Sequence, residues 1–79
     1  MNEVEFIYDG KPTIIQCNLE DKLKDLCNKF TTKNNLDINN IYILFNGDKV
    51  NLECKFNEIN KGKNKITFLV YSTKTNSKI

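Results

Sequence analysis

The sequence predicts a small α+β domain in which one mixed β-sheet carries a single amphipathic helix on one face. Only one segment, in the first half of the chain, has the three- and four-residue apolar spacing of a helix. Short segments on either side of it have strand character instead. A chain of 79 residues is long enough for only one hydrophobic core. One helix can then bury only one face of one sheet.

The first two elements are expected to form a β-hairpin. Val4, Phe6 and Tyr8 alternate with Glu3, Glu5 and Ile7, which is the period-two pattern of a half-buried strand. The turn-forming residues Asp9-Gly10-Lys11-Pro12 interrupt this strand, and Ile14-Ile15-Gln16-Cys17 resumes an extended pattern.

A helix of about three turns is expected next. Asn18 is a suitable N-cap, and Asp21 would stand at the third helical position of a weak capping box. The apolar residues of the helix face are Leu19, Leu23, Leu26, Cys27 and Phe30, and the opposite face holds Glu20, Lys22, Lys24, Asp25 and Lys29. The polar residues 31–35 are expected to end the helix.

The second half of the chain is expected to hold three strands. Ile41 to Phe45 form a β-prone segment, Asn46-Gly47 favours a tight turn, and Lys49 to Leu52 form a short return strand. A single helical turn with Phe56 and Ile59 should precede the last strand, Ile66 to Tyr71. We expect the domain to span residues 1–71 and the polar residues 72–79 to form a disordered tail.

Alternation assigns each strand residue to the core or to the opposite face of the sheet. The expected core consists of Val4, Phe6, Ile15, Cys17, Ile43, Phe45, Ile66, Phe68 and Val70, packed against Leu23, Leu26 and Phe30. The opposite face is apolar as well, because Ile7, Tyr42, Leu44, Leu69 and Tyr71 lie on it. Contiguous exposed apolar patches usually mark binding surfaces, so this face is the candidate site for a protein partner.

Composition argues against catalysis and metal binding. The chain has no His, so an imidazole base and the commonest nitrogen ligand for metals are both missing. The three cysteines, Cys17, Cys27 and Cys54, form no C-x-x-C pair, and we expect reduced thiols, with Cys54 the most exposed. The glycines at positions 10, 47 and 62 form no phosphate-binding loop. We therefore expect no enzyme activity, no cofactor and no metal.

Charge and hydropathy limit the partners. The net charge is only +2, all cations are lysines, and a nucleic-acid role is therefore not expected. No apolar segment approaches the roughly 20 residues of a membrane helix, and no secretory signal is apparent. We expect a monomer without membrane contact in the cytoplasm or nucleus. The many Asn and Ile residues, and the absence of Ala and Arg, are typical of an AT-rich genome.

The order of these elements resembles the ubiquitin-like β-grasp family. The residues that carry the resemblance are Ile15-Gln16-Cys17 with Leu23, Leu26 and Phe30, then the segments 43–50 and 56–59. The resemblance covers Val4 to about Tyr71. It implies that the first and last strands lie parallel at the centre of the sheet, with the helix crossing one face.

The resemblance also implies a docking surface. Leu44 is at the position of the family's central patch isoleucine, Leu69 at that of its valine, and Thr67 at that of its histidine. Tyr42 and Tyr71 stand where ubiquitin has two arginines used in activation. Ubiquitin-like modifiers end in Gly-Gly, and this chain has no adjacent glycines. A domain that is recognised rather than conjugated is expected.

The leading hypothesis is therefore a non-catalytic domain of a larger protein that docks a ubiquitin-pathway partner. The resemblance implies a ubiquitin-binding helical module, a proteasomal receptor or an adaptor as that partner. A β-grasp signalling module of the Ras-binding or PB1 type is one alternative, although residues 14–17 are not basic and residues 48–58 lack an acidic cluster. A modifier truncated before its Gly-Gly is the other.

Overall fold

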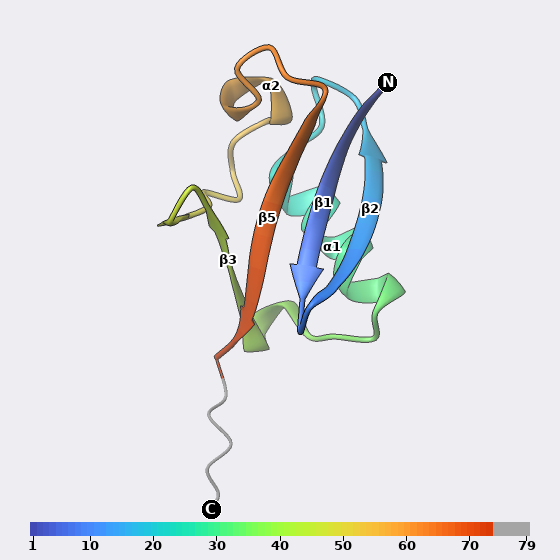
Figure 1. The fold of residues 1–79 in the computed structure, drawn as a ribbon, viewed down its shortest axis with the longest axis vertical. Coiled ribbons are helices and arrows are strands. Elements are labelled where there is room, and N and C mark those ends of the chain that lie inside the picture. The colour runs from blue at the N-terminus through green and yellow to red at the C-terminus, as the bar shows by residue number, and fades with distance from the viewer. Residues whose placement is uncertain (74–79) are drawn as a thin grey trace, which may run out of the picture.

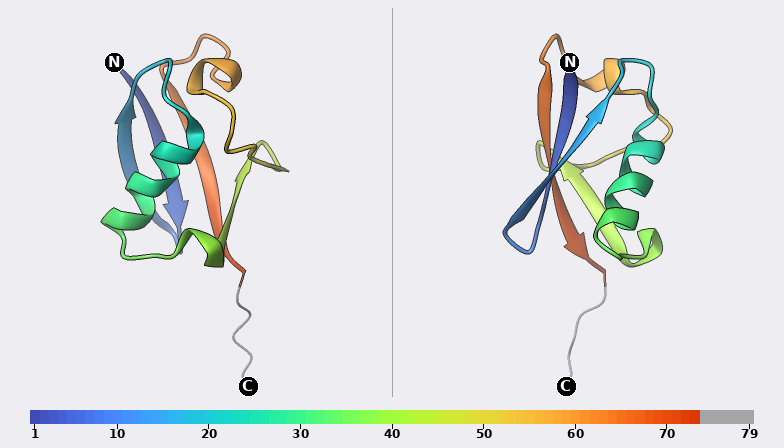
Figure 2. Two further views of the ribbon diagram at one scale, coloured as in Figure 1. Left: turned by 180° about the vertical axis from the view of Figure 1, so that it is seen from behind. Right: turned by 90° about the vertical axis from the view of Figure 1, so that its right-hand side faces the viewer.

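The computed structural model describes residues 1–73 and shows a five-stranded mixed sheet with one helix packed across a single face (Figure 1). The elements are β1 Asn2–Tyr8, β2 Lys11–Cys17, α1 Leu23–Lys33, a 3-10 turn η1 Ile38–Asn40, β3 Ile41–Phe45, β4 Asp48–Lys49, α2 Phe56–Ile59 and β5 Lys65–Ser72. The predicted α+β, β-grasp fold is confirmed. In the turned views of Figure 2, α1 lies on one side of the sheet and leaves the other side uncovered.

The strands follow the order β2-β1-β5-β3-β4. β1 and β5 pair in parallel at the centre, and the other neighbours pair antiparallel. The central parallel pair is what the family resemblance implied. It joins the first and last strands of the chain, so that residues far apart in sequence share one surface.

Two tight turns set the register of the two hairpins. Asp9 and Gly10 both have positive φ, and so do Asn46 and Gly47. This is the conformation of two-residue hairpin turns that match the twist of a β-sheet. The first turn pairs Tyr8 directly with Lys11, so β2 begins three residues earlier than the predicted Ile14. β2 can contain Pro12 because it is an edge strand, where one row of N–H groups has no partner strand.

Aromatic rings form the centre of the core. Phe6 stacks on Phe30 with ring centroids 4.6 Å apart, and Phe68 meets Phe6 edge-on at 5.4 Å. The predicted core residues are buried except for Phe45, which is half-buried and packs edge-on against Phe68. Cys27, Phe56 and Ile41 complete the core. The core therefore lies between α1 and the inner face of the sheet.

The start of α1 differs from the prediction. The helix begins at Leu23 with Lys22 as N-cap, and no side chain caps it. Asn18 and Asp21 form a separate turn instead, in which the Asn18 N–H donates to Asp21 Oδ2 at 2.9 Å. Leu19 was expected on the buried helix face and is 46% exposed in this turn.

Carbonyl groups from a distant loop replace the missing cap. The Leu23 N–H donates to the Cys54 carbonyl at 2.8 Å, and the Lys24 N–H donates to the Leu52 carbonyl at 3.0 Å. The first N–H groups of any helix lack partners within the helix. Here the loop after β4 supplies those partners, so a side chain at position 18 is not needed and the chain can turn before the helix starts.

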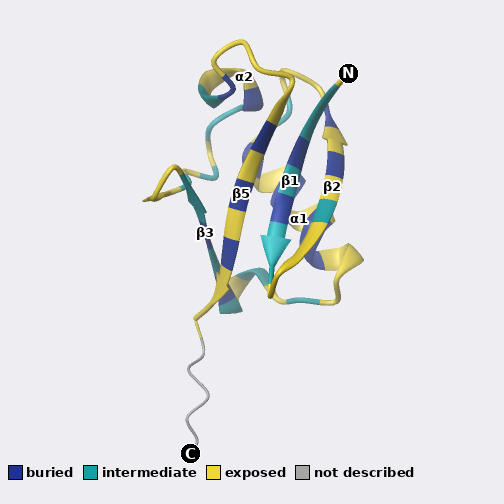
Figure 3. Ribbon diagram, viewed as in Figure 1, coloured by how far each residue is buried: buried dark blue, intermediate teal, exposed yellow. Residues whose placement is uncertain are grey.

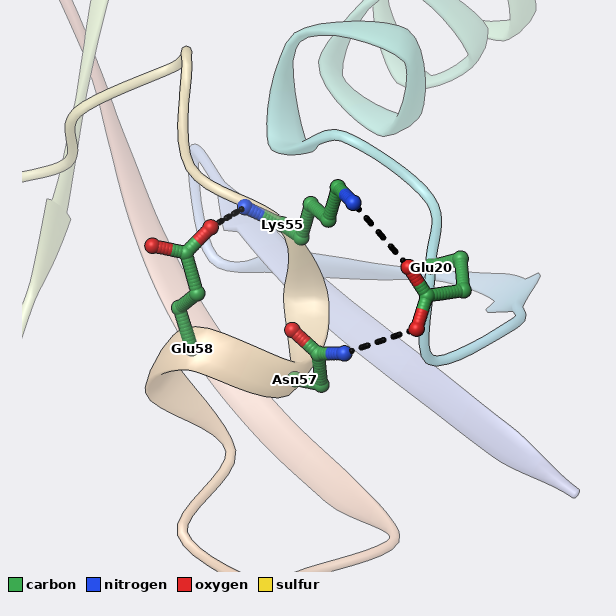
Figure 4. Close-up of polar contacts among 4 residues, drawn as sticks. All are labelled: Glu20, Lys55, Asn57 and Glu58. Carbon is green, nitrogen blue, oxygen red and sulfur yellow. Dashed lines mark hydrogen bonds and ion pairs between the residues drawn. The ribbon is translucent and has the colours of Figure 1, made fainter.

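Side chains hold the same two loops together (Figure 4). The Glu20 carboxylate accepts hydrogen bonds from Lys55 Nζ at 3.0 Å and Asn57 Nδ2 at 3.1 Å. The Lys55 N–H donates to Glu58 Oε2 at 2.9 Å at the start of α2. These groups are exposed, so they orient the loops rather than supply much of the folding free energy.

The return strand is also shorter than expected. It was predicted over Lys49 to Leu52, and β4 contains only Asp48 and Lys49. The Val50 N–H still donates to the Ile43 carbonyl at 3.0 Å. Beyond that bond the chain leaves β3, because the Leu52 carbonyl is used to cap α1.

The last strand ends later than predicted. Ser72 belongs to β5, and the Thr73 N–H donates to the Asn40 carbonyl at 2.8 Å. Ser72 and Thr73, which were expected in the tail, are therefore bonded into the domain. The rest of that tail, residues 74–79, lies outside the described residues.

Candidate partner-binding surface

The strand β5 places alternate side chains on opposite faces of the sheet. Ile66, Phe68 and Val70 point into the core and are buried. Thr67, Leu69 and the neighbouring outward residues are exposed, which Figure 3 shows as alternating bands along the strand. Side chains of successive strand residues point to opposite faces, so this burial pattern follows from the pleat. The uncovered face is here called the outer face.

An apolar row crosses the outer face at right angles to the strands. The cross-strand partners in this row are Pro12 with Ile7, Ile7 with Leu69, and Leu69 with Leu44. Directly opposed residues of an antiparallel pair have Cβ atoms about 4.5–5.5 Å apart, and neighbouring strands of either kind lie about 4.7–4.9 Å apart. Ile7 and Leu44 are half-buried and Leu69 is 40% exposed. The row is thus continuous over four strands without being part of the core.

A tyrosine pair extends this row on one side. Tyr42 and Tyr71 are cross-strand partners, and their rings stack with centroids 5.5 Å apart. Lys49 Nζ lies 5.8 Å from the centroid of the Tyr42 ring, within the range of a cation–π contact. Tyr71 is 44% exposed. The pair offers a flat aromatic surface next to Leu44 and Leu69.

The other side of the row is polar. Thr67 Oγ1 donates to Glu5 Oε1 at 3.2 Å, and Lys65 Nζ lies 3.9 Å from the same oxygen. Glu5 and Thr67 are cross-strand partners. The outer face therefore changes from aromatic and aliphatic to charged along the strand direction, and it has a defined polar border.

All six sequence-predicted site residues lie together on this face. Pro12, Glu5 and Lys49 belong to the same surface and were missed. Pro12 was assigned to a turn, although the Asp9-Gly10 signal was sufficient to start the second strand at Lys11. Lys49 could have been paired with Leu44 from the two-residue turn at Asn46-Gly47, because turn length sets the register.

The thiols are part of the core side of the molecule. Cys27 is fully buried, and burial raises the pKa of its thiol to about 12. Burial also raises the pKa of the Cys17 thiol, with a smaller contribution from the nearby Asp21 carboxylate. Cys54 is half-buried. A raised pKa keeps a thiol protonated at neutral pH, which is unfavourable for nucleophilic chemistry.

In residues 1–73 no three His, Cys, Asp or Glu side chains gather closely enough to hold a metal ion. No helix in this part of the chain combines the length and the apolar character needed to cross a bilayer.

Comparison with known proteins points to one family. Residues 8–60, which are more than half of the chain, match the family model described as "Ubiquitin-2 like Rad60 SUMO-like". No curated protein matches the sequence.

A similar solved structure is the crystal structure of ATBAG1 in complex with HSP70, with a TM-score of 0.77 and 11% sequence identity. The match covers 91% of this chain and 40% of that one, so this chain spans less than half the length of its structural neighbour. At this identity the likeness shows the fold alone. The family match by itself shows that the chain belongs to the Rad60 SUMO-like family of ubiquitin-like domains.

Proposed function

We propose that this ubiquitin-like domain is non-catalytic and docks a protein partner of the ubiquitin-proteasome pathway through its outer face. The apolar row from Pro12 to Leu44, bordered by the stacked tyrosines, is the single observation that carries the proposal. Aromatic and aliphatic side chains at the centre of a patch are the types that supply most interface free energy.

Several findings support this proposal. α1 covers the inner face only, so the outer row meets no other element of residues 1–73. The family match identifies a ubiquitin-like domain, a fold class that this chain shares with a protein solved in a complex. The three free cysteines agree with the reducing interior of the cell, where we place the protein.

The proposal can be tested by titrating the isotope-labelled domain with a ubiquitin-binding helical module and following amide shifts by NMR. We expect the shifts to cluster on Ile7, Leu44, Thr67 and Leu69. Leu44→Ala or Leu69→Ala should weaken binding by about 2 kcal/mol, as expected for interface anchors.

Leu19→Ala is the matched control, because Leu19 is an exposed leucine that lies in the turn before α1. It should leave binding unchanged. Shifts confined to the β2 edge, over residues 14–17, would favour the Ras-binding type of module instead. Equal effects of Leu19→Ala and Leu69→Ala would contradict docking through the outer face.

A further inference from the structure

A small apolar pocket opens at the edge of the sheet, next to β3. Its volume is about 170 Å³, and its aliphatic lining is Ile38, Ile41, Ile43, Val50 and Leu52. Tyr42 and Lys49 complete the lining. The pocket shares these two residues with the border of the outer face, but its aliphatic part is formed by other residues.

The pocket exists because two chain segments diverge. Val50 is still bonded to β3 through its N–H and the Ile43 carbonyl at 3.0 Å. Two residues later the Leu52 carbonyl accepts from the Lys24 N–H at 3.0 Å and is held against α1. The return strand therefore leaves the sheet at a point where β3 continues, and a gap with aliphatic walls remains between them.

β3 directs main-chain N–H and C=O groups toward this gap. In an antiparallel strand, alternate residues direct both their N–H and their C=O to the same neighbour. The Ile43 carbonyl faces the diverging segment, so the Ile43 N–H and the Ile41 carbonyl face the same edge. Within residues 1–73, no main-chain hydrogen bond joins residues 51 or 52 to β3. Such an edge can pair with an added extended strand.

The positively charged Lys49 lies at this pocket. Lys49 Nζ lies near the Tyr42 ring, and the ion pairs found in the described part of the chain use Lys55 and Lys65. Lys49 thus has no carboxylate partner among those residues. An acidic group on a ligand would meet this ammonium group without competition from an ion pair of the domain.

We propose that the β3 edge is a second binding site, which takes a short extended peptide with an aliphatic side chain in the pocket and an adjacent carboxylate on Lys49. An extended ligand fits better than a helical one, because the main-chain groups of a helix are already used within the helix. The site is separate from the outer-face row, and it does not depend on the docking role proposed above.

The probe for this site is a blocked tetrapeptide of threonine, leucine, glutamate and threonine, titrated into the labelled domain and followed by NMR. We expect saturable shifts at the amides of Ile43, Lys49 and Val50. Replacing the glutamate of the peptide by glutamine should weaken binding about threefold, the range of an exposed ion pair. Replacing its leucine by serine should abolish the saturable shifts.

Matched lysine variants test the charge. Lys49→Gln should remove the preference for glutamate over glutamine, whereas Lys63→Gln, at an exposed lysine that is not part of the pocket lining, should preserve it. Leu69→Ala should leave peptide binding unchanged, so failure of this proposal is distinguishable from failure of outer-face docking. Equal binding of the leucine and serine peptides, or shifts centred on Leu69, would overturn the proposal.

Discussion

The two sides of β5 differ sharply although their side chains are similar. On the inner side, Phe68 is completely buried and Val70 is 3% exposed. On the outer side, Leu69 is 40% exposed and Tyr71 is 44% exposed. Both sides thus hold one aliphatic and one aromatic residue within the same four positions of a central strand. The difference is that α1 covers the inner side alone.

This comparison separates two roles that composition cannot distinguish. An apolar side chain under α1 contributes to the free energy of folding, because its removal leaves a cavity that neighbours fill only in part. An apolar side chain on the outer face leaves no enclosed cavity when it is removed. Stability and partner binding are therefore expected to depend on different, alternating residues of one strand.

The largest expected effect is that of Phe68→Ala. Phe68 meets Phe6 and Phe45 edge-on and has no exposed surface, so the substitution should lower the free energy of unfolding by about 3–5 kcal/mol. Urea denaturation followed by circular dichroism measures this loss. Phe30→Ala empties the same region from the helix side and should cost a similar amount. A loss below about 1 kcal/mol for Phe68→Ala would reverse the assignment of the two faces.

Stability should fall at alkaline pH because a thiol, Cys27, is buried on the inner side of the sheet. Burial raises the pKa of the Cys27 thiol from 9.0 to about 12, so the folded state holds this proton more tightly than the unfolded chain. The protonated Cys27 thiol therefore contributes to the free energy of unfolding. This contribution is complete below pH 9, and it is lost at about 1.4 kcal/mol per pH unit as the pH rises toward 12. Denaturation midpoints of wild type and Cys27→Ala between pH 8 and 11 measure it. Parallel pH profiles for the two proteins would contradict this prediction.

The labelling rates of the three cysteines report directly how far each thiol is buried. Cys54 is half-buried, whereas Cys17 of β2 and Cys27 of α1 are buried. A thiol reagent at neutral pH should modify Cys54 faster than the other two by about tenfold or more, because the buried thiols react only after local opening. Mass spectrometry of partially labelled protein assigns the sites. In denaturant the three rates should converge, and rapid native labelling of Cys27 would show that the core is more open than its geometry indicates.

The smallest expected effect is that of Leu69→Ala on stability. Leu69 lies next to Phe68 in the chain but on the outer face, so the change in unfolding free energy should stay within about 0.5 kcal/mol. The thermal melt of this variant, run beside that of Phe68→Ala, measures the contrast. A one-residue slip of the strand would exchange the two results, because it moves every side chain to the other face.

Much of the fold could be predicted from local patterns. The alternation in β5 and the turn residues at Asn46-Gly47 led to the correct strand and turn, because both features depend on neighbouring residues alone. The placement of the candidate site residues on the outer face could be predicted for the same reason, since alternation assigns faces. The parallel pairing of β1 with β5 came from the family resemblance, because no local pattern specifies the partner of a strand.

Two of the differences, at the start of α1 and at the end of β4, arise from one long-range contact. The carbonyls of Leu52 and Cys54 bond to the N–H groups at the start of α1, which delays the helix to Leu23 and ends β4 at Lys49. The local sequence favours Asn18 as the cap and a longer return strand, because a hydrogen bond between groups about 30 residues apart leaves no pattern among neighbouring residues. The pocket beside β3 is a consequence of the same contact and was not expected.

The sequence by itself determined which side chains share a face, where the two hairpins turn and which segment is helical, because these properties follow from periods of two and 3.6 residues. Only the tertiary structure decided which strands are neighbours and where α1 and β4 begin and end. Those features depend on main-chain groups brought together from distant parts of the chain, which no pattern of neighbouring residues encodes.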